Sequence, residues 1–383
     1  MRAPEWARGP ASAIAASARG ASGVAVAIRQ GDRRAVVTYG RTAHGGAPVT
    51  ADTRFETGSL TKCFTALLLA ELAARGEVSY GDPLTRLLPP DRVPAPRGGP
   101  ITLLHLATHT SGLPRLPPGL LAGAAPRWFT NPYEGFRTDD LLRALARTRP
   151  FARPGDRVRY SNFGVGLLGH LLGRAVPGRL GYGELLADRI LDPLGLHRTG
   201  CAPGLRQATG YWHGRARPPW RIPGLAGAGA IRSSARDLLT LLDALLDAPP
   251  DASPDAPVAT STGTDTGTGT GTGTGTTSNT GTGADSLSLS LSAPLRAALA
   301  DVVRPRLALR GGTGRLALVW NIRVRPDGDV YHHSGGTRGF TAFAGFGPRH
   351  RTAVVALANT APSADQRFIQ SAYGTLLSLP GGL

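Results

Sequence analysis

The segment "FETGSLTKCF", residues 55–64, contains the only lysine of the chain, Lys62, among 43 lysine and arginine residues. Ser59 precedes Lys62 by three positions. It lies just before the stretch "LTKCFTALLLAELAARGE" (60–77), whose almost uninterrupted apolar pattern predicts a buried helix. Side chains three positions apart on a helix lie on one face, with Cβ atoms about 5–6 Å apart. The sequence therefore places a hydroxyl and an amine side by side at a helix start.

This pair has the chemistry of an activated nucleophile. A serine hydroxyl is a weak nucleophile and needs a nearby base. A lysine in a partly buried site can lose its proton near neutral pH, whereas an arginine does not deprotonate in proteins. The helix start also favours negative charge that develops near Ser59. Because the chain uses arginine at every other basic position, the single lysine indicates that an amine is chemically required at Lys62.

A second motif, "RYSNFG" (159–164), contains Tyr160 and Asn162 in a Y-x-N pattern. A tyrosine beside a lysine can act as a base or a proton relay. The Asn162 side chain offers both a donor and an acceptor to a substrate amide. Taken alone, this pattern is more typical of a surface turn.

A third motif, "HHSGGTRGF" (332–340), lies on a predicted strand near the C-terminus. Its glycines allow close approach of a substrate backbone. The backbone N–H of Gly336 is predicted to pair with that of Ser59 as an oxyanion hole. Strand alternation directs His333 to the site and His332 to the opposite face. The alternative for either histidine is a packed or solvated strand residue.

Strand-like patterns lie at both ends of the chain and helical patterns lie between them. The stretch "GVAVAIRQGDRRAVVTYG" (23–40) predicts a hairpin with a turn at "QGDR". Residues 315–360 alternate strand-like runs with turns, and residues 363–379 predict a final helix. The two ends of the chain are therefore expected to share one sheet.

These patterns predict two domains and an insertion. Residues 1–85 and 295–383 are assigned to an α/β sheet domain, and residues 86–246 to a mainly helical domain. A Thr-Gly repeat at 261–283 contains nothing that buries apolar area, so residues 247–294 are predicted to be a disordered insertion.

Composition narrows the classes of function. The net charge is +17, but the arginines are scattered without a long basic run, so no nucleic-acid partner is expected. No apolar stretch of about 18 residues predicts a membrane span, and the two cysteines do not make a disulfide framework. The nine histidines show no metal-binding spacing, so neither a metal nor another cofactor is expected. The N-terminus lacks a signal-peptide core, which favours a cytoplasmic location.

With its three motifs in this order, the chain resembles the serine β-lactamase-like family. More narrowly, it resembles the branch of class C β-lactamases, D-alanyl-D-alanine carboxypeptidases and esterases. Further blocks that resemble the family, in family order, are "ITLLHLATHTSGLP", "PGDRVRYSNFGVGLLGHLLG", "ILDPLGLHRTG" and "AGAGAIRSSARDLLTLLDALL". The resemblance covers residues 20–360. It implies an α+β fold, with an antiparallel sheet flanked by helices, an inserted mainly helical domain, and the site in the cleft between them.

The resemblance also implies roles for the first two motifs. Ser59 would be the acylated nucleophile and Lys62 its proton partner. Tyr160 would be the base for acylation and would help activate water for deacylation. Asn162 would orient the substrate amide.

In the third motif, His333 occupies the place of the family's usual lysine, and Ser334 and Gly335 complete the triplet. A lysine carries a fixed positive charge for a substrate carboxylate, whereas a histidine is mostly neutral at pH 7. This departure lowers the expectation of efficient β-lactam hydrolysis. Arg338 is predicted to restore positive charge near the site; the alternative is a solvated loop arginine.

The sequence therefore predicts a serine hydrolase that forms an acyl-enzyme on Ser59 and cleaves small esters, D-amino-acid peptides or amides, or β-lactams. Esterase or D-Ala-D-Ala carboxypeptidase-like activity is expected ahead of efficient β-lactamase activity. The alternative is a penicillin-recognising module that is non-catalytic or is acylated stoichiometrically. The expected partner is a small-molecule ester, amide or peptide, and the oligomeric state is left open.

Overall fold

The computed structural model describes residues 3–96, 98–124, 127–202, 205–248, 291–309 and 314–379. The predicted insertion at 247–294 lies outside these residues except at its two ends. The division of the chain into a sheet domain and a helical domain stays a prediction.

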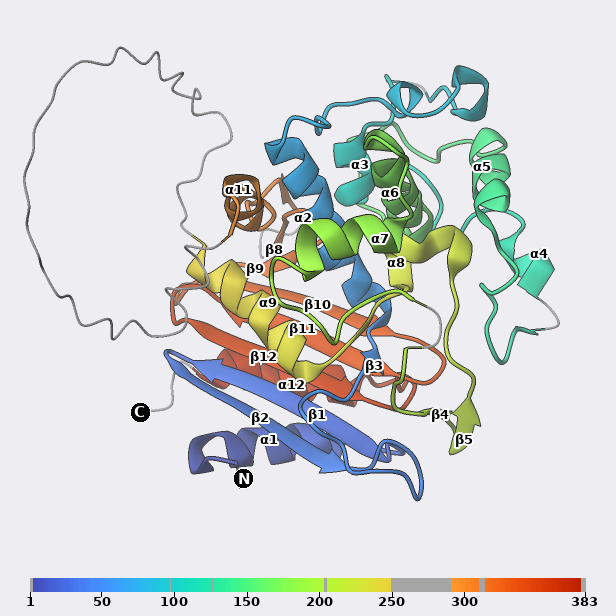
Figure 1. The fold of residues 1–383 in the computed structure, drawn as a ribbon. Coiled ribbons are helices and arrows are strands. Elements are labelled where there is room, and N and C mark those ends of the chain that lie inside the picture. Colours follow the sequence, from blue (N-terminus) through green and yellow to red (C-terminus); the bar gives the residue numbers. More distant parts are fainter. Residues whose placement is uncertain are drawn as a thin grey trace, which may run out of the picture.

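Among the described residues, eight strands form one antiparallel sheet at the centre of the protein (Figure 1). Their order is β2-β1-β12-β11-β10-β9-β8-β7, so strands from the two ends of the chain pair as β1 and β12. The pairing of β1 with β2 confirms the predicted hairpin. The strands are β1 (Gly23–Gln30), β2 (Arg33–Gly40), β7 (Leu307–Ala308), β8 (Gly314–Leu316), β9 (Asn321–Arg323), β10 (Val330–Gly336), β11 (Thr341–Gly347) and β12 (Thr352–Ala358).

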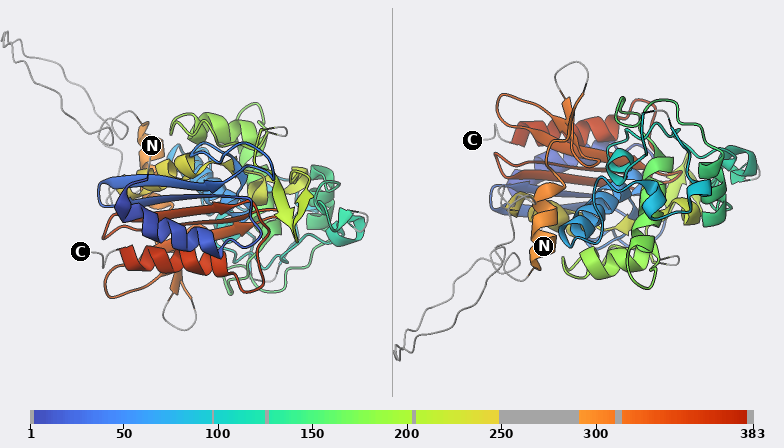
Figure 2. Two further views of the ribbon diagram at one scale, coloured as in Figure 1. Left: turned by 90° about the horizontal axis from the view of Figure 1, so that it is seen from below. Right: turned by 90° about the horizontal axis from the view of Figure 1, so that it is seen from above.

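Helices cover both faces of this sheet. On one face α1 (Glu5–Ser17) and α12 (Arg367–Ser378) lie side by side (Figure 2). On the other face α9 (Ala235–Asp247) packs on β1, β11 and β12. The long helix α2 (Thr61–Ala74) and α11 (Ala293–Asp301) pack against each other on this side. Every residue of β11 and β12 is consequently buried, as in a sheet covered on both faces.

Helix α1 is an element that the sequence reasoning missed. Its buried face consists of Ala7, Ala11 and Ile14, which recur at helical spacing and pack with side chains of β1 and β2. Two of these three residues are alanines, so the apolar stripe is weak in the sequence. The sheet surface supplies the burial that the stripe alone does not indicate.

The remaining helices gather beyond one end of the sheet, together with two short two-stranded sheets (Figure 1). The helices are α3 (Leu103–Ala107), α4 (Leu120–Ala124), α5 (Thr138–Ala146), α6 (Asn162–Ala175), α7 (Tyr182–Leu186) and α8 (Ala226–Gly229). One small sheet pairs β3 (Phe55–Glu56) with the distant β6 (Arg232–Ser233), and the other is the hairpin of β4 (Gly210–Trp212) and β5 (Arg215–Arg217).

Helices α6 and α8 approach each other through glycines. A Cβ on Gly169 would lie 2.8 Å from the Cα of Gly227, so a side chain at this position would push the helices apart. This close contact fixes how near α8 lies to α6. Helix α8 carries the carbonyl of Ala228, which belongs to the site described below.

Candidate active site

Ser59 lies where β3 passes through one 3₁₀ turn, Gly58–Leu60, into α2. Gly58 has a φ of +51°, in the left-handed region that favours glycine. A Cβ there would lie 2.6 Å from the carbonyl oxygen of Gly336 on β10. The glycine therefore allows the turn that carries Ser59 to pack directly against the end of β10.

The side chains of Ser59, Lys62 and Tyr160 meet in one hydrogen-bonded group. The Ser59 Oγ accepts hydrogen bonds from Lys62 Nζ at 2.9 Å and from the Tyr160 hydroxyl at 2.6 Å. Lys62 Nζ also donates to the Ala228 carbonyl at 2.8 Å and lies 5.0 Å from the centroid of the Tyr160 ring. The structure thus brings the predicted nucleophile, amine and phenol together, although 101 positions separate Ser59 from Tyr160.

Lys62 is completely buried. Burial lowers the pKa of its ammonium group, and the nearby Arg115 guanidinium lowers it further, while Tyr160 acts in the opposite direction. The balance of these effects leaves the pKa of Lys62 below its ordinary value. A lysine in this environment is suited to take a proton from the Ser59 hydroxyl.

The start of α6 fixes Tyr160 and Asn162. Ser161 caps the helix by accepting a hydrogen bond from the backbone N–H of Gly164 at 2.8 Å, and its own hydroxyl donates to the Pro114 carbonyl at 2.6 Å. The backbone N–H of Asn162 donates to the Arg115 carbonyl at 2.9 Å. Tyr160 and Asn162 therefore flank a residue anchored on both sides.

Asn162 presents an unsatisfied amide group to the site. Its Oδ1 is buried and has no hydrogen-bond partner among the described residues. The residue lines the same cleft as Ser59. A buried polar atom without a partner is costly, so this oxygen is suited to accept a hydrogen bond from a substrate N–H.

The predicted third motif lies on β10, and its glycines allow the backbone of β10 to pack directly against the turn that carries Ser59. A Cβ on Gly335 would lie 2.0 Å from the Thr57 carbonyl oxygen and 2.8 Å from the Ser59 nitrogen. A Cβ on Gly58 would lie 2.7 Å from the Gly336 nitrogen. The backbones that carry the two predicted oxyanion-hole N–H groups are therefore adjacent.

His333 is buried in the cleft wall, with its ring centroid 6.5 Å from that of Tyr160. Its Nδ1 lies 2.8 Å from the Ser334 carbonyl, which fixes Nδ1 as the protonated nitrogen. Burial, together with Lys62, lowers the pKa of His333 to about 3, so the ring is neutral at pH 7. His332 lies on the opposite face of β10, against Tyr373 of α12, with ring centroids 4.9 Å apart.

These residues border a cleft of about 690 Å³. Every residue predicted for the site except buried Lys62 lines it, including Ser334, Gly335, Gly336 and Arg338. Arg115 lines it as well, and no aspartate or glutamate does so among the described residues. The cleft therefore has a positive wall formed by two arginines.

Three contributors to the site were not identified from the sequence. Ala228 acts through its backbone carbonyl, which leaves no signal in a side-chain pattern. His109 lies beside Tyr160, with ring centroids 4.7 Å apart and an interplanar angle of 43°, and its Nδ1 accepts a hydrogen bond from the Ser161 N–H at 3.2 Å. The backbone φ of His109 is +58°, which is rare outside glycine. The segment "HTSG" (109–112), whose composition is typical of a turn, was the only sign of this conformation in the sequence.

The third contributor is Glu56, which is buried just before the turn of Ser59. Its carboxylate accepts hydrogen bonds from the Thr337 hydroxyl at 2.7 Å and from the Trp220 N–H at 2.6 Å. Glu56 is one of the two residues of β3, a strand too short to give a sequence pattern that singles it out. Glu56 ties the segment beyond β10 to the segment that carries Ser59.

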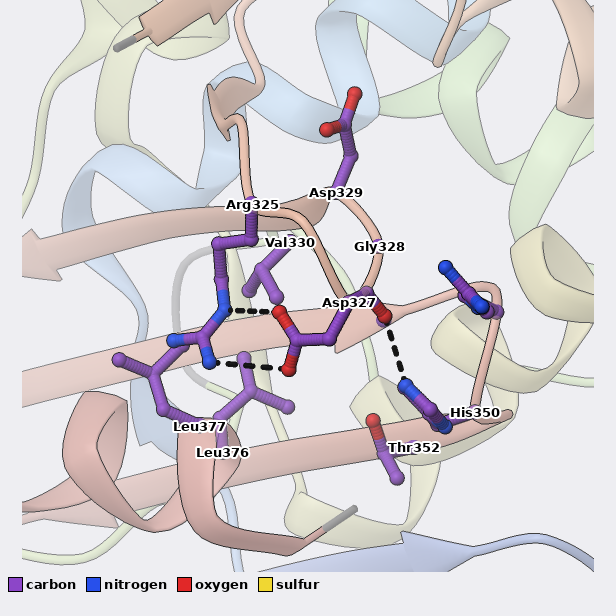
Figure 3. A pocket seen from close by; sticks show the side chains of 11 residues that line it. Arg325, Asp327, Gly328, Asp329, Val330, His350, Thr352, Leu376 and Leu377 are labelled. Atoms are coloured by element: carbon purple, nitrogen blue, oxygen red, sulfur yellow. Dashed lines mark hydrogen bonds and ion pairs between the residues drawn. The ribbon is translucent and has the colours of Figure 1, made fainter. Parts of the chain in front are cut away.

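A second hollow lies at the other end of β10, between the turns that connect β9 to β10 and β11 to β12 (Figure 3). Its volume is about 10 Å³, which suits at most one water molecule. Its charged groups are already engaged. The Arg325 guanidinium pairs with the Asp327 carboxylate at 2.9 and 3.0 Å, and His350 Nε2 lies 2.8 Å from the Asp327 carbonyl. No ligand site is indicated there.

The described residues also bear on two other classes of site. No group of three or more histidine, cysteine, aspartate or glutamate side chains is arranged to hold a metal ion within that part of the chain. Among the same residues, no helix has the length and hydropathy to cross a membrane.

Relatives of known sequence match parts of the chain. The D-alanyl-D-alanine-carboxypeptidase/endopeptidase AmpH of Escherichia coli K12 is 37% identical over 190 residues, which are 48% of this chain and 46% of that protein. A Beta-lactamase of Pseudomonas fluorescens is 31% identical over 224 residues, which are 57% of this chain and 58% of that protein. The chain thus spans about half the length of the curated relatives it matches.

Solved structures match nearly the whole fold. A β-lactamase/D-alanine carboxypeptidase from Pseudomonas syringae has a TM-score of 0.72 at 22% identity, over 96% of this chain and 99% of its own. A class C β-lactamase from Rhodobacter sphaeroides has a TM-score of 0.72 at 24% identity, over 96% of this chain and 99% of its own. These likenesses confirm the predicted α+β fold. A family profile described as Beta-lactamase matches residues 11–375, and the chain therefore belongs to the beta-lactamase family.

Proposed function

We propose that this protein is a serine hydrolase that forms an acyl-enzyme on Ser59. The observation that carries the proposal is the placement of Lys62 Nζ and the Tyr160 hydroxyl at 2.9 and 2.6 Å from the Ser59 Oγ. Both distances lie within the reach needed for proton transfer. Membership of the beta-lactamase family supports the same reaction class.

The acylation step follows from this geometry. The Ser59 Oγ attacks the substrate carbonyl carbon and passes its proton to the Tyr160 oxygen, while the Tyr160 hydroxyl gives its own proton to the neutral amine of Lys62. The backbone N–H groups of Ser59 and Gly336 stabilise the negative charge that develops on the carbonyl oxygen. The bond from the carbonyl carbon to the leaving group then breaks; the leaving group takes a proton from Tyr160, and Lys62 returns a proton to Tyr160. Water later releases the acyl group from Ser59, with Tyr160 as the base.

The substrate amide is held by Asn162. Its buried Oδ1 has no hydrogen-bond partner among the described residues, and the side chain lines the cleft beside Ser59. An acceptor in this place matches a substrate with an N–H near the scissile carbonyl, such as an acylated D-amino acid or a D-peptide.

Neutral His333 favours ester or D-peptide substrates over β-lactams. Its pKa of about 3 removes the positive charge from the third motif at neutral pH. The carboxylate of a β-lactam therefore lacks a cation at this position. The names of the relatives include both a carboxypeptidase/endopeptidase and β-lactamases, so the preference rests on His333.

The test combines labelling with turnover. A serine-reactive fluorophosphonate should label the wild-type protein, and Ser59→Ala should remove the label while circular dichroism shows an intact fold. Equal labelling of the variant would exclude Ser59 as the nucleophile. Rates on a p-nitrophenyl ester and on a chromogenic cephalosporin, measured side by side, test the preference. A higher kcat/KM on the cephalosporin would reverse our ordering, and acylation without turnover would support a penicillin-recognising module instead.

A further inference from the structure

Arg338 lies against two indole rings at the cleft wall. It lies in the turn between β10 and β11, two positions after Gly336. Its Cζ is 5.3 Å from the ring centroid of Trp128 and 5.0 Å from that of Trp212. Trp128 follows α4, and Trp212 ends β4. Three segments that are distant in the sequence therefore build the surroundings of one guanidinium.

Further contacts brace the two indoles. Phe129 stacks on Trp212 with centroids 6.1 Å apart and an interplanar angle of 19°. Arg217 lies on the same indole at 4.8 Å, and its Nη1 donates to the Phe129 carbonyl at 3.2 Å. These contacts connect Trp212 to the segment that carries Trp128.

The strand β4 is also tied to the turn that carries Arg338. The Tyr211 N–H donates to the Gly339 carbonyl at 3.2 Å. A Cβ on Gly210 would lie 2.9 Å from the Cα of Gly339, so only a glycine allows this backbone approach. Arg338 is thus restrained through both its side chain and its own backbone segment.

The charge of Arg338 has no carboxylate partner within 4 Å among the described residues. Other partly buried arginines of the chain do have such partners, for example Arg29 with Asp243 at 2.6 Å and Arg306 with Asp301 at 2.6 Å. Stacking on aromatic rings uses the flat faces of a guanidinium and leaves its N–H edges for hydrogen bonds. Those edges match the geometry of a carboxylate, which a guanidinium binds through two parallel hydrogen bonds.

The rest of the cleft wall supports an anionic ligand. Arg115 lies beside Tyr160, with its Cζ 5.2 Å from the ring centroid, and also lines the cleft. Tyr133 lines the same cleft; burial raises the pKa of its phenol, and the charges of Arg115 and Arg338 act in the opposite direction. No described lining residue carries a negative charge. An acidic substrate group would therefore meet positive charge without competition from a carboxylate of the protein.

We propose that Arg338, in contact with Trp128 and Trp212, binds a carboxylate of the substrate and makes the enzyme selective for acid-bearing esters or amides. This inference rests on the proposed function, because it concerns the substrate that acylates Ser59. It makes Arg338 a specificity-determining residue at a position outside the third-motif triplet, where His333 supplies no charge.

The turnover test uses two esters that differ only in the carboxylate, 3-carboxyphenyl acetate and phenyl acetate. A hydrogen-bonded carboxylate–guanidinium contact corresponds to a loss of roughly 10- to 100-fold when it is removed. Arg338→Gln should therefore lower kcat/KM on the acidic ester by this factor, mainly through KM, and by much less on the neutral ester. Arg338→Lys should recover only part of the loss, because an ammonium group neither stacks flat nor binds bidentately.

A matched control is Arg33→Gln. Arg33 also stacks on an indole, that of Trp6 at 4.9 Å, but it lies on β2, away from the cleft. The control removes the same charge, so it should leave the ratio between the two esters unchanged. Equal losses on both esters in Arg338→Gln, or a wild-type protein without preference for the acidic ester, would overturn the inference.

A binding test separates this inference from the proposed function. In the Ser59→Ala protein, calorimetry compares N-acetyl-D-alanyl-D-alanine with its C-terminal amide, so no turnover is needed. Tighter binding of the acid, lost on adding Arg338→Gln, would support carboxylate recognition even if Ser59 proved not to be the nucleophile. Equal binding of acid and amide, or no binding of either, would overturn it.

Discussion

Replacing Lys62 by arginine tests whether the site needs a removable proton. The side chain is completely buried, and its Nζ lies 2.9 Å from the Ser59 Oγ and 2.8 Å from the Ala228 carbonyl oxygen. Lys62→Arg keeps a hydrogen-bond donor, but its side chain is permanently charged and cannot accept a proton. If Lys62 exchanges a proton with Ser59, the variant loses the base contribution, which is about 10²- to 10⁴-fold in rate. That loss corresponds to about 3–5 kcal/mol of activation free energy.

A second variant separates the chemical effect from a structural one. Lys62→Met keeps most of the volume but leaves the Ala228 carbonyl without its donor, which costs about 1–3 kcal/mol of folding free energy. The guanidinium of Lys62→Arg adds volume to a closed site, at a similar cost of about 1–3 kcal/mol. Both variants should therefore show comparable losses in thermal denaturation, and both should fail in acylation.

The assay is the pre-steady-state burst of p-nitrophenol from p-nitrophenyl acetate, followed by stopped flow as a function of pH. Wild-type protein should release one equivalent rapidly. Lys62→Arg should release it slowly at every pH that the fold tolerates. A burst at the wild-type rate in a folded Lys62→Arg protein would refute the reasoning, because a permanently charged side chain would then suffice.

Three further predictions follow from the same geometry. His333→Lys should raise kcat/KM on a chromogenic cephalosporin relative to a p-nitrophenyl ester, because it places a cation in the third motif; an unchanged ratio of the two rates would contradict this. Gly335→Ala places a Cβ 2.0 Å from the Thr57 carbonyl oxygen, so it should lower both Tm and fluorophosphonate labelling. Gly374→Ala, where a Cβ meets nothing within 4 Å, is the control, and equal Tm values for the two variants would argue against close packing at β10. Burial lowers the pKa of His333 to about 3, whereas an unfolded histidine titrates near 6.5. The unfolded chain therefore binds more protons as pH falls through this window, and the free energy of unfolding decreases. Urea denaturation at about pH 7 and about pH 4.5 should show a smaller decrease in His333→Gln than in the wild type, and parallel decreases would contradict the assignment.

Local patterns in the sequence were enough for the elements with strong apolar signals. The continuous apolar run after Ser59 gave α2, and the alternating stretch at 23–40 gave the hairpin of β1 and β2. Helix α1 was missed because its buried face is mostly alanine. An alanine side chain buries little apolar area, so the amphipathic pattern of this helix is weak in the sequence. Its burial depends on the sheet surface, which forms only when the two ends of the chain meet.

The residues of the candidate site also fall into two groups, those placed by local spacing and those placed by tertiary packing. Ser59 and Lys62 lie on one helical turn, so their spacing alone predicts the contact. Tyr160 and His333 reach the site through tertiary packing, and spacing carries no information about that; the resemblance to a family supplied both. Ala228 contributes a backbone carbonyl, which no side-chain pattern reveals. Trp128 contributes an aromatic ring near Arg338, and nothing in the sequence around Trp128 indicates that contact. Such contributors become visible only in three dimensions.

Arginine and lysine have different chemical roles in the cleft. A fixed positive charge can be supplied by arginine, because a guanidinium stays protonated and can be oriented by stacking, as at Arg338. A proton acceptor cannot be an arginine, and the one lysine stands where the acceptor is needed. If the guanidinium of Arg338 binds the substrate carboxylate, the third motif no longer requires a cation. The neutral His333 is then compatible with recognition of acidic substrates.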